Sequence, residues 1–299
     1  MGFVHQIQVQ ALHHSIQSTN VNVQTSLLKS AAQRVLKRAH VYERAKASFL
    51  YDLFWMAADR RVIDGRRCEV EFYRNLLVGF RSGDLIFDIG ANDGFKTDIF
   101  LRLGARVVAV EPDRSNQTIL ADKFLKYRLV KKPVSIVPKA VSSKNGCETF
   151  WINEPGSPKN TLNEKWVKIL QVNETKFGRQ LDFRNTVIVE TVTLEDLINV
   201  YGSPFFVKID VEGYELNVLE GMRQSVPYLS FEVNLPEFKN EGLKCLNLLK
   251  ALSPYGLFNY SIDEQTHLAA PRWMDATAFQ RVLSKCAGNS VEVFWRSAG

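Results

Sequence analysis

The 299-residue sequence lacks a membrane-spanning run, a secretion signal and any grouping of its cysteines. No stretch approaches the roughly 18 consecutive apolar residues that cross a bilayer, and the N-terminus has no basic start followed by an apolar run. The four cysteines lie far apart with no C-x-x-C pair, at Cys68, Cys147, Cys245 and Cys286. This spacing excludes the usual zinc-ligand pattern and a disulfide framework. We therefore expect a cytoplasmic protein with reduced thiols.

A strong excess of one charge is also missing. Lys plus Arg number 38 and Asp plus Glu number 32, which gives a formal net charge of +6. Basic pairs such as Lys37-Arg38 and Lys131-Lys132 are scattered, whereas a nucleic-acid-binding surface gathers its basic residues on one face. We expect a solvated basic surface and no nucleic-acid partner. With 45% hydrophobic and 23% charged residues, the composition is that of a globular protein that buries a full core.

Residues 1 to about 65 contain no proline and few glycines. Apolar residues between Thr25 and Asp59 follow mixed helical spacings. We predict an N-terminal helical extension, 1–65, followed by one α/β domain, 66–299. Apolar stripes on such helices usually pack on a neighbouring domain or a second subunit, so a homo-oligomer formed through this extension is one expected arrangement.

From Leu85 onwards, short apolar runs alternate with amphipathic stretches, which is the pattern of βαβ units in a mostly parallel sheet. Seven strands are predicted, at 85–89, 107–110, 134–137, 205–209, 229–233, 257–260 and 291–295. Helices are predicted near 96–103, 115–126, 215–222, 242–252 and 276–285. An excursion after the third strand holds strands at 148–152 and 186–192 around a polar helix from 163 to about 172. The expected fold is α/β, a Rossmann-like doubly wound, mostly parallel seven-stranded sheet, with the excursion shaping the substrate entrance.

The segment Leu85–Thr97, LIFDIGANDGFKT, runs from a buried strand through a glycine turn into a helix. Gly90 and Gly94 let the backbone approach a ligand, and ligands of open α/β sheets bind at the carboxyl ends of the strands. Asp88 and Asp93 bring negative charge to this turn, which disfavours the pyrophosphate of a dinucleotide. S-adenosylmethionine has no phosphate and carries an ammonium and a sulfonium, so the turn favours this cofactor.

The second strand ends in VAVEPD, residues 108–113. The carboxylate of Glu111 is suited to accept both hydroxyls of a ribose, although a loop acid paired with an arginine is the structural alternative. Asp113 is interpreted as the N-cap of the next helix. Ala140 and Val141 follow the third strand; they either line the adenine or simply pack at the strand end, and both interpretations are open.

These motifs resemble the FkbM-type family of S-adenosylmethionine-dependent methyltransferases, over about Glu69 to Val233. The shared segments are DIGANDG at 88–94, VEPD at 110–113, KAVSSKNG at 139–146, VTLEDL at 192–197 and, most specific, VKIDVEGYELNVLEGM at 207–222. The resemblance implies O-methylation of a hydroxyl on a sugar, glycan or natural product. It assigns cofactor binding to Asp88, Gly90, Asn92, Gly94 and Glu111, and it supplies no catalytic residue.

Methyl transfer to a hydroxyl needs a group that removes a proton. Asp210 closes the fourth strand, and Glu232 and Asn234 share one face of the fifth, so we predict Asp210 and Glu232 as the catalytic carboxylates. One acts as a general base, or Asp210 with Glu232 or Asn234 holds a magnesium or calcium ion that acidifies the hydroxyl. Base catalysis is the preferred hypothesis. Glu212 and Glu215 are interpreted as acids that favour the start of the following helix.

Other functions also fit the sequence. The net charge and Lys208, close to Asp210, would suit an enzyme that methylates RNA ribose, but no RNA-binding module or aromatic-rich basic strand is visible. Protein methylation is a further alternative. A non-catalytic cofactor-binding protein belongs to a different class, because a fold alone does not establish activity. Transfer of a methyl group to any acceptor would distinguish an enzyme from a binding protein.

Overall fold

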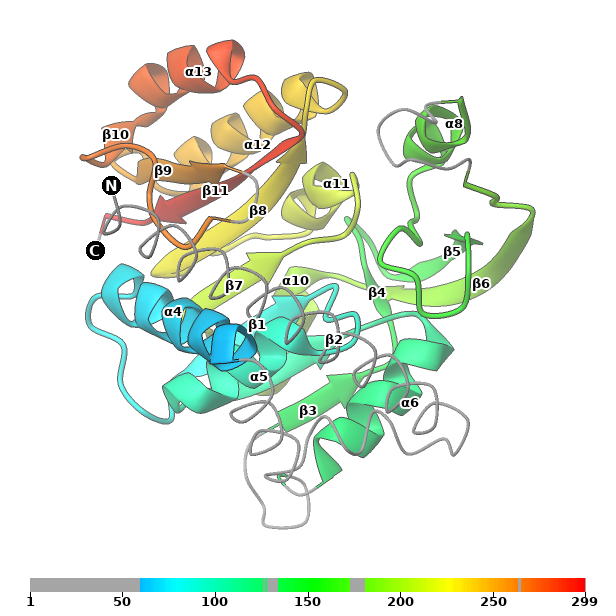
Figure 1. Ribbon diagram of the computed structural model, residues 1–299. Helices are drawn as coiled ribbons and strands as arrows, with labels where there is room; N and C mark the ends of the chain where they lie inside the picture. Colours follow the sequence, from blue (N-terminus) through cyan, green and yellow to red (C-terminus); the bar gives the residue numbers. More distant parts are fainter. Residues whose placement is uncertain (1–59, 126, 128–133, 173–180, 263–264, 299) are drawn as a thin grey trace, which may run out of the picture. The chain divides into compact units, whose positions relative to one another are not determined.

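The computed structural model of the protein describes residues 60–125, 127, 134–172, 181–262 and 265–298 (Figure 1). The chain divides into two compact units, Met1–Gly65 and Arg66–Gly299. Of the first unit, only the residues that begin helix α4 (Arg60–Leu76) are described. The predicted helical extension and its expected oligomer contact lie outside the described residues.

An eight-stranded sheet forms the centre of this unit, with the strand order β10-β9-β11-β8-β7-β1-β2-β3. The strands are β1 (Leu85–Ile89), β2 (Arg106–Val110), β3 (Val134–Val137), β7 (Phe206–Ile209), β8 (Tyr228–Asn234), β9 (Leu257–Ile262), β10 (Met274–Asp275) and β11 (Ser290–Arg296). From β8 to β3, neighbouring strands are parallel. In contrast, β11 is antiparallel to both β8 and β9, and β10 is antiparallel to β9.

The seven strands predicted from the sequence are all present, but the prediction of a seven-stranded sheet is wrong. The two residues of β10 add an eighth strand, and they are too few to show a period. The sheet is also mixed, because β11 inserts antiparallel between β8 and β9. Apolar periodicity marks where strands lie along the chain, and it carries no information on their order or direction. The α/β class with a Rossmann-like parallel core is confirmed.

Helices cover both faces of the sheet. On one face lie α4, α5 (Phe95–Leu103) and α6 (Arg114–Lys123), and there the rings of Tyr73 and Phe206 both pack around Phe100. On the other face lie α10 (Leu194–Tyr201), α11 (Glu215–Glu220), α12 (Lys239–Leu252) and α13 (Ala276–Lys285). Since both faces are covered, the central strands β1 and β7 are buried along their whole length and consist of nearly continuous apolar runs.

The excursion between β3 and β7 forms a second sheet in the order β4-β6-β5, at the right of Figure 1. Its strands are β4 (Ala140–Val141), β5 (Gly146–Ile152) and β6 (Asn185–Val192), and helix α8 (Glu164–Val172) lies between β5 and β6 in the chain. The strands and the helix predicted for this excursion are confirmed. The short strand β4 pairs parallel with β6 and ties this sheet to the chain that leaves β3.

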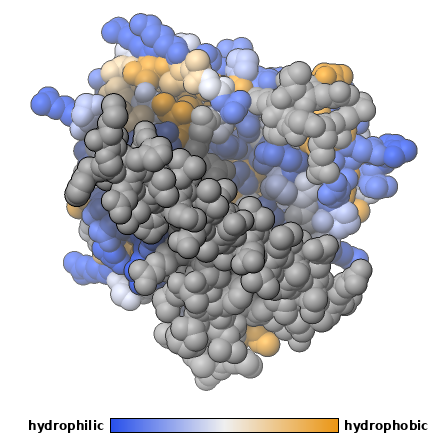
Figure 2. Space-filling model, in the orientation of Figure 1, coloured by the Kyte–Doolittle hydropathy of each residue, from blue (hydrophilic) through white to orange (hydrophobic). Residues whose placement is uncertain are grey.

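The surface of the described residues is mostly hydrophilic in the view of Figure 2. Apart from the adjacent pair Val187 and Ile188, the large apolar side chains that are exposed among the described residues are scattered along the chain, at Val78, Phe95, Leu125, Val172, Val200 and Tyr255. Among the residues that the structure describes, no helix combines the length and the apolar character that crossing a membrane requires.

Candidate active site

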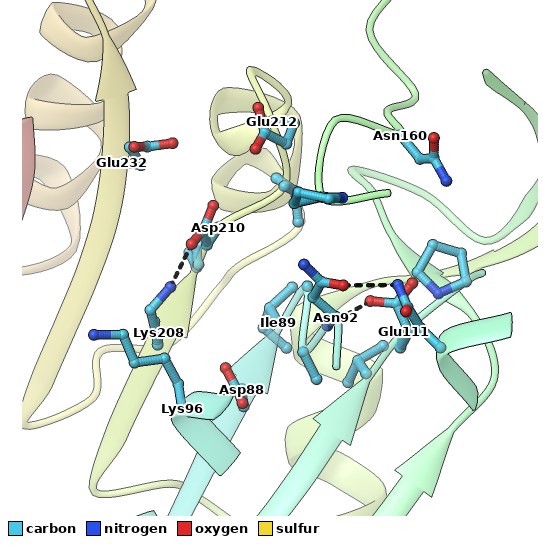
Figure 3. Close-up of a pocket in the computed structure, with 18 of the residues that line it drawn as sticks. Asp88, Ile89, Asn92, Lys96, Glu111, Asn160, Lys208, Asp210, Glu212 and Glu232 are labelled. Atoms are coloured by element: carbon cyan, nitrogen blue, oxygen red, sulfur yellow. Dashed lines mark hydrogen bonds and ion pairs between the residues drawn. The ribbon is translucent and has the colours of Figure 1, made fainter. Parts of the chain in front are cut away.

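A pocket of about 470 Å³ opens at the carboxyl ends of β1, β2, β7 and β8. Strand β1 lies between β2 and β7, so the strand order reverses at this point, where open α/β sheets bind their ligands. The volume lies within the usual range for small-molecule sites. Figure 3 shows Glu111 on one side of the pocket and Asp210, Glu212 and Glu232 on the other. We call these sides the Glu111 end and the Glu232 end.

The glycine turn brings the ends of β1 and β7 together. Gly90 has a φ of 82°, and a Cβ at this position would lie 1.9 Å from the backbone oxygen of Asp210. Gly94, with a φ of 76°, begins α5, and a Cβ there would lie 2.6 Å from Leu120. Both positions therefore require glycine for close packing as well as for conformation. Asn92 also has a positive φ, of 48°, which exposes its backbone N–H to Glu111.

Glu111 is 4% exposed and lines the pocket. One carboxylate oxygen accepts from the backbone N–H of Asn92 at 2.7 Å, and the other accepts from that of Asp113 at 2.8 Å. These bonds fix the carboxylate, and each oxygen keeps capacity to accept a further hydrogen bond. Burial raises the pKa of Glu111 to about 7, against the effect of the two backbone donors. Among the described residues, Glu111 is held by the backbone N–H groups of Asn92 and Asp113 and forms no ion pair with an arginine, so the structural alternative does not apply.

Other polar and apolar groups complete the Glu111 end. Asn116 is 2% exposed; its amide nitrogen donates to the side-chain oxygen of Asn92, and its own oxygen has no hydrogen-bond partner among the described residues. Ala140 and Val141 are buried and line the pocket, together with Phe150 of β5. The sequence did not single out Asn116 or Phe150. Asn116 lies in the first turn of α6, from where its side chain reaches back to Asn92 in the glycine turn.

Asp88 lies at the floor of the pocket and is 1% exposed. It accepts a hydrogen bond of 2.5 Å from the hydroxyl of Thr97. Burial raises its pKa, and the nearby ammonium of Lys208 acts in the opposite direction. Asp113 caps α6 by accepting from the N–H of Ser115, as its position in the sequence predicts.

Asp210 follows β7 directly and forms an ion pair of 2.7 Å with Lys208. Desolvation in the pocket would raise the pKa of Asp210, but the ammonium of Lys208 outweighs it and holds this pKa below the usual value. Asp210 is therefore an ionised carboxylate with low proton affinity. Lys208, which is 4% exposed, lies on the same face of the sheet as Asp88, its register partner on β1.

Glu232 on β8 has the opposite character. Desolvation raises its pKa well above the usual value, and the charges of Asp210 and Glu212 add to this effect. It accepts one hydrogen bond of 3.2 Å from the amide of Asn234. Glu232 therefore holds a proton more tightly than Asp210 does, and Asn234 supports Glu232 rather than reaching the pocket lining.

A loop between β5 and α8 closes the Glu232 end. Lys159 pairs with Glu212 at 2.8 Å, Trp166 donates to the same carboxylate at 3.2 Å, and Thr161 donates to the backbone oxygen of Glu212 at 2.8 Å. Glu212 has a positive φ of 54° and is held in it by these contacts. Its interpretation as a helix-start acid is wrong, whereas Glu215 does accept from backbone N–H groups before α11, at Val211 and Gly213.

Carboxylate oxygens of Asp210, Glu212 and Glu232 lie within 4.8 Å of one another, a spacing compatible with a metal ion. Two of these carboxylates already have a lysine partner, Lys208 for Asp210 and Lys159 for Glu212. The lysines neutralise charge that a divalent cation would need. The arrangement therefore favours a metal less than three unpaired carboxylates would.

The fold and the pocket define a Rossmann-like α/β protein with a small-molecule site at its switch point. A family profile for the methyltransferase FkbM domain matches residues 88–256, more than half of the chain. The chain belongs to this family of methyltransferases, and the resemblance seen in its motifs is confirmed. A search of curated proteins gives no significant match.

Solved structures with a similar fold include methyltransferases from three bacteria. Precorrin-6y C5,15-methyltransferase from Geobacter metallireducens shares 9% identity over 78% of this chain and 87% of that chain, with a TM-score of 0.37. The C-terminal domain of precorrin-6Y C5,15-methyltransferase from Rhodobacter capsulatus shares 12% identity over 75% of this chain and 85% of that chain, with a TM-score of 0.36. A SAM-dependent methyltransferase from Agrobacterium tumefaciens shares 7% identity over 77% of this chain and 61% of that chain, with a TM-score of 0.38.

Proposed function

We propose that the protein is an S-adenosylmethionine-dependent methyltransferase that methylates a hydroxyl of a sugar, glycan or natural product. The observation that carries the proposal is the division of one pocket into two ends. A fixed, buried carboxylate, Glu111, lies at one end, and two carboxylates with opposite proton affinity, Asp210 and Glu232, lie at the other. The Glu111 end suits a ribose, and the Glu232 end suits proton transfer from a hydroxyl.

The Glu111 end fits the adenosine part of the cofactor. Glu111 offers acceptor capacity on both oxygens, and the unpartnered oxygen of Asn116 provides a further acceptor at the same end. A buried acceptor without a partner is costly, so a ligand that donates to Asn116 would remove this cost. Val141 and Phe150 supply apolar surface for a base. Glu111, Asn92, Gly90 and Ala140 would hold the cofactor with them.

The charge of the pocket fits a cofactor with positive groups. Its lining contains eight acidic side chains and four lysines, although the whole chain has a formal net charge of +6. S-adenosylmethionine supplies, when bound, a methyl group made electrophilic by a positive sulfur. Asp88, at the start of the glycine turn, and Asp210, directly after the neighbouring strand β7, both line the pocket, so they would stabilise the positive end of this molecule.

Glu232 is the better candidate for the proton acceptor. A carboxylate with a higher pKa accepts a proton more readily, and the pKa of Glu232 is raised by burial and by the neighbouring carboxylates whereas that of Asp210 is lowered by Lys208. In the proposed step, the acceptor oxygen forms a bond to the methyl carbon while the carbon–sulfur bond breaks and its electron pair stays on sulfur. The hydroxyl proton moves to Glu232. Asp210, held ionised by Lys208, stabilises positive charge beside the reacting atoms.

The same pocket argues against an RNA acceptor, because phosphates would meet the excess of carboxylates at the Glu232 end. If the acceptor were a peptide, or if the protein only bound the cofactor without turnover, there would be no reason to expect Glu232 and Asp210 to differ in proton affinity. Methylation of a neutral hydroxyl explains this difference.

The test is transfer of a labelled methyl group from S-adenosylmethionine into an extract of the source organism, followed by isolation of labelled products. We expect a methyl ether that strong alkali does not cleave, which distinguishes it from a methyl ester. The Glu232→Gln variant should bind the cofactor and give little product. Absence of label in every product, or full activity of this variant, would contradict the proposal.

A further inference from the structure

The loop between β5 and α8 is attached at both ends of the pocket. Near the Glu111 end, the Asp113 carboxylate accepts from the backbone N–H of Gly156 at 2.9 Å and from the amide of Asn160 at 2.7 Å. At the Glu232 end, Thr161 donates to the backbone oxygen of Glu212 at 2.8 Å. Residues 157–160, between these attachments, line the pocket. The loop therefore holds its side chains in fixed places along the pocket wall.

Lys159 brings a positive charge from this loop to the carboxylates of the Glu232 end. Its ammonium contacts both oxygens of Glu212, at 2.8 and 3.1 Å. Carboxylate oxygens of Asp210, Glu212 and Glu232 lie within 4.8 Å of one another, on the same side of the pocket in Figure 3. Burial would lower the pKa of Lys159, but the charges of these three carboxylates, that of Glu212 first, raise it above the usual value. Lys159 therefore keeps its proton beside these carboxylates.

Glu232 depends on Lys159 for compensation of its charge. To take a proton from the acceptor hydroxyl, Glu232 must first be ionised. Burial and the charges of Asp210 and Glu212 raise the pKa of Glu232, whereas the charge of Lys159 lowers it. The nearby ammonium of Lys208 already forms an ion pair with Asp210, and in the described part of the chain Glu232 forms no ion pair of its own. Without Lys159, Glu232 would retain its proton and could not act as a base.

Attachment of the loop alone does not explain this lysine. The indole of Trp166 also donates to the Glu212 carboxylate. The amide of Asn163 donates to the backbone oxygen of Gly213, so the loop is attached here without the ammonium. A largely buried ion pair contributes little net stability, because removing both charges from water is costly. Lys159 and Glu212 both line the pocket, so their charges act on groups that react there.

We propose that Lys159 is a positioning residue for methyl transfer: its ammonium holds the Glu212 carboxylate in place and supplies the positive charge that allows Glu232 to ionise before it accepts the hydroxyl proton. This inference rests on the proposed function. During the reaction Lys159 keeps its own proton, and the hydroxyl proton moves to Glu232. The lysine thus takes the part that a divalent cation plays in other carboxylate clusters. The loop before α8 thereby completes the catalytic end of the pocket.

The first experiment compares Lys159→Ala and Lys159→Arg with Lys168→Ala, a control at an exposed position on α8 that pairs with Glu164 one turn away. Labelled methyl transfer into the extract of the source organism is measured at saturating S-adenosylmethionine. We expect Lys159→Ala to lower the rate roughly tenfold to a hundredfold, as loss of coupling within one ion-pair network does. Lys159→Arg keeps the charge and should retain more of the rate. The affinity for S-adenosylhomocysteine should stay that of the wild type in all three variants, which also shows that they fold.

The second experiment restores the missing charge without the side chain. n-Propylammonium has the atoms that Lys159→Ala removes, so it can occupy the space left and donate to Glu212. We expect it to raise the rate of Lys159→Ala in a saturable way and to leave the wild type and Lys168→Ala unchanged. Tetramethylammonium carries the same charge but has no N–H donor, so at equal ionic strength it should not restore the rate. A lysine that only attached the loop would show no such dependence on the added ion.

The outcomes separate this role of Lys159 from the proposed function. A wild-type rate in Lys159→Ala, or a loss that neither Lys159→Arg nor n-propylammonium reverses, overturns the role and leaves the methyltransferase function standing. A loss of affinity for S-adenosylhomocysteine in Lys159→Ala would also overturn it, because the lysine would then support the cofactor or the fold. If a chelator abolished the wild-type rate and magnesium restored it, a metal ion would supply the charge and the role would be refuted. No label with the wild type would contradict the proposed function itself, and this inference would fall with it.

Discussion

If Glu111 binds the cofactor as proposed, cofactor affinity should depend on pH in a predictable direction. Burial raises its pKa from 4.5 to about 7. In the proposed complex the ionised form accepts hydrogen bonds from the ribose, so binding should favour loss of the proton and affinity should rise with pH. A group with a pKa of about 7 is ionised to about one tenth at pH 6 and about nine tenths at pH 8. The affinity for S-adenosylhomocysteine should therefore increase roughly tenfold over this interval.

The same shift has a defined effect on the stability of the ligand-free protein. The pKa of Glu111 is higher in the folded state than in the unfolded state. Its contribution to stability is therefore fully present below about pH 4.5 and is lost as pH rises through about 7. Because the ligand favours the ionised form, it should stabilise the protein more at pH 8 than at pH 6, which a thermal denaturation series measures.

The assay is calorimetric titration with S-adenosylhomocysteine at pH 6, 7 and 8, in buffers of different ionisation enthalpy. The wild type should release a proton on binding at pH 6 and almost none at pH 8. In Glu111→Gln the charge-assisted bonds are lost, at about 1.5 to 3 kcal/mol or roughly tenfold to a hundredfold in affinity, and the proton release disappears. Glu220→Gln, the same change at an exposed position on α11, is the matched control. A wild-type affinity that is flat across this range, or a Glu111→Gln variant with wild-type affinity, would refute the reasoning.

Three further predictions concern the Glu232 end and the glycine turn. Glu232→Gln should lower kcat by ~100-fold to 10,000-fold with little change in cofactor affinity, measured by single-turnover methyl transfer; a normal rate would remove the general base. Asp210→Asn leaves Lys208 without its partner, so it should lower both kcat and Tm, whereas a chelator should leave the wild-type rate unchanged. If a chelator abolished the activity of the wild type and added magnesium restored it, a metal mechanism would be favoured instead. Gly90→Ala should lower Tm and abolish cofactor binding, since its Cβ would lie 1.9 Å from a backbone oxygen; a variant with wild-type Tm would contradict this packing argument.

The sequence predicted the parts of the fold that depend on local patterns. The strands around Asp88 and Asp210 are short apolar runs bounded by turn residues, and such runs are visible without a structure. Strand order is a non-local property, so the insertion of β11 between β8 and β9 was not predicted. Helix α10 was missed although Thr193 and Asp196 form a capping pair at its start, which the sequence does contain.

In the candidate site, too, residues in local motifs were predicted and contacts between distant segments were not. Gly90 and Glu111 each lie in a continuous motif, and Glu232 was predicted from its alternation with apolar residues; the structure places all three in the pocket lining. Glu292 has the same alternation, between Val291 and Val293, but it lies beside Glu232 in the pocket lining only because β11 pairs with β8. Lys159 contacts Glu212 across 53 positions of sequence, and nothing local announces this pair. The opposite proton affinities of Asp210 and Glu232 also arise only when the folded chain brings their neighbours together.

The central claim is that S-adenosylmethionine binds between Glu111 and the Asp210–Glu232 carboxylates. A crystal structure of the protein with this cofactor tests it most directly. We predict that both ribose hydroxyls lie within hydrogen-bond distance of the Glu111 carboxylate and that the sulfonium methyl faces the side of the pocket that holds Asp210 and Glu232. A cofactor bound elsewhere, or bound in this pocket with its methyl directed away from these two carboxylates, would contradict the account.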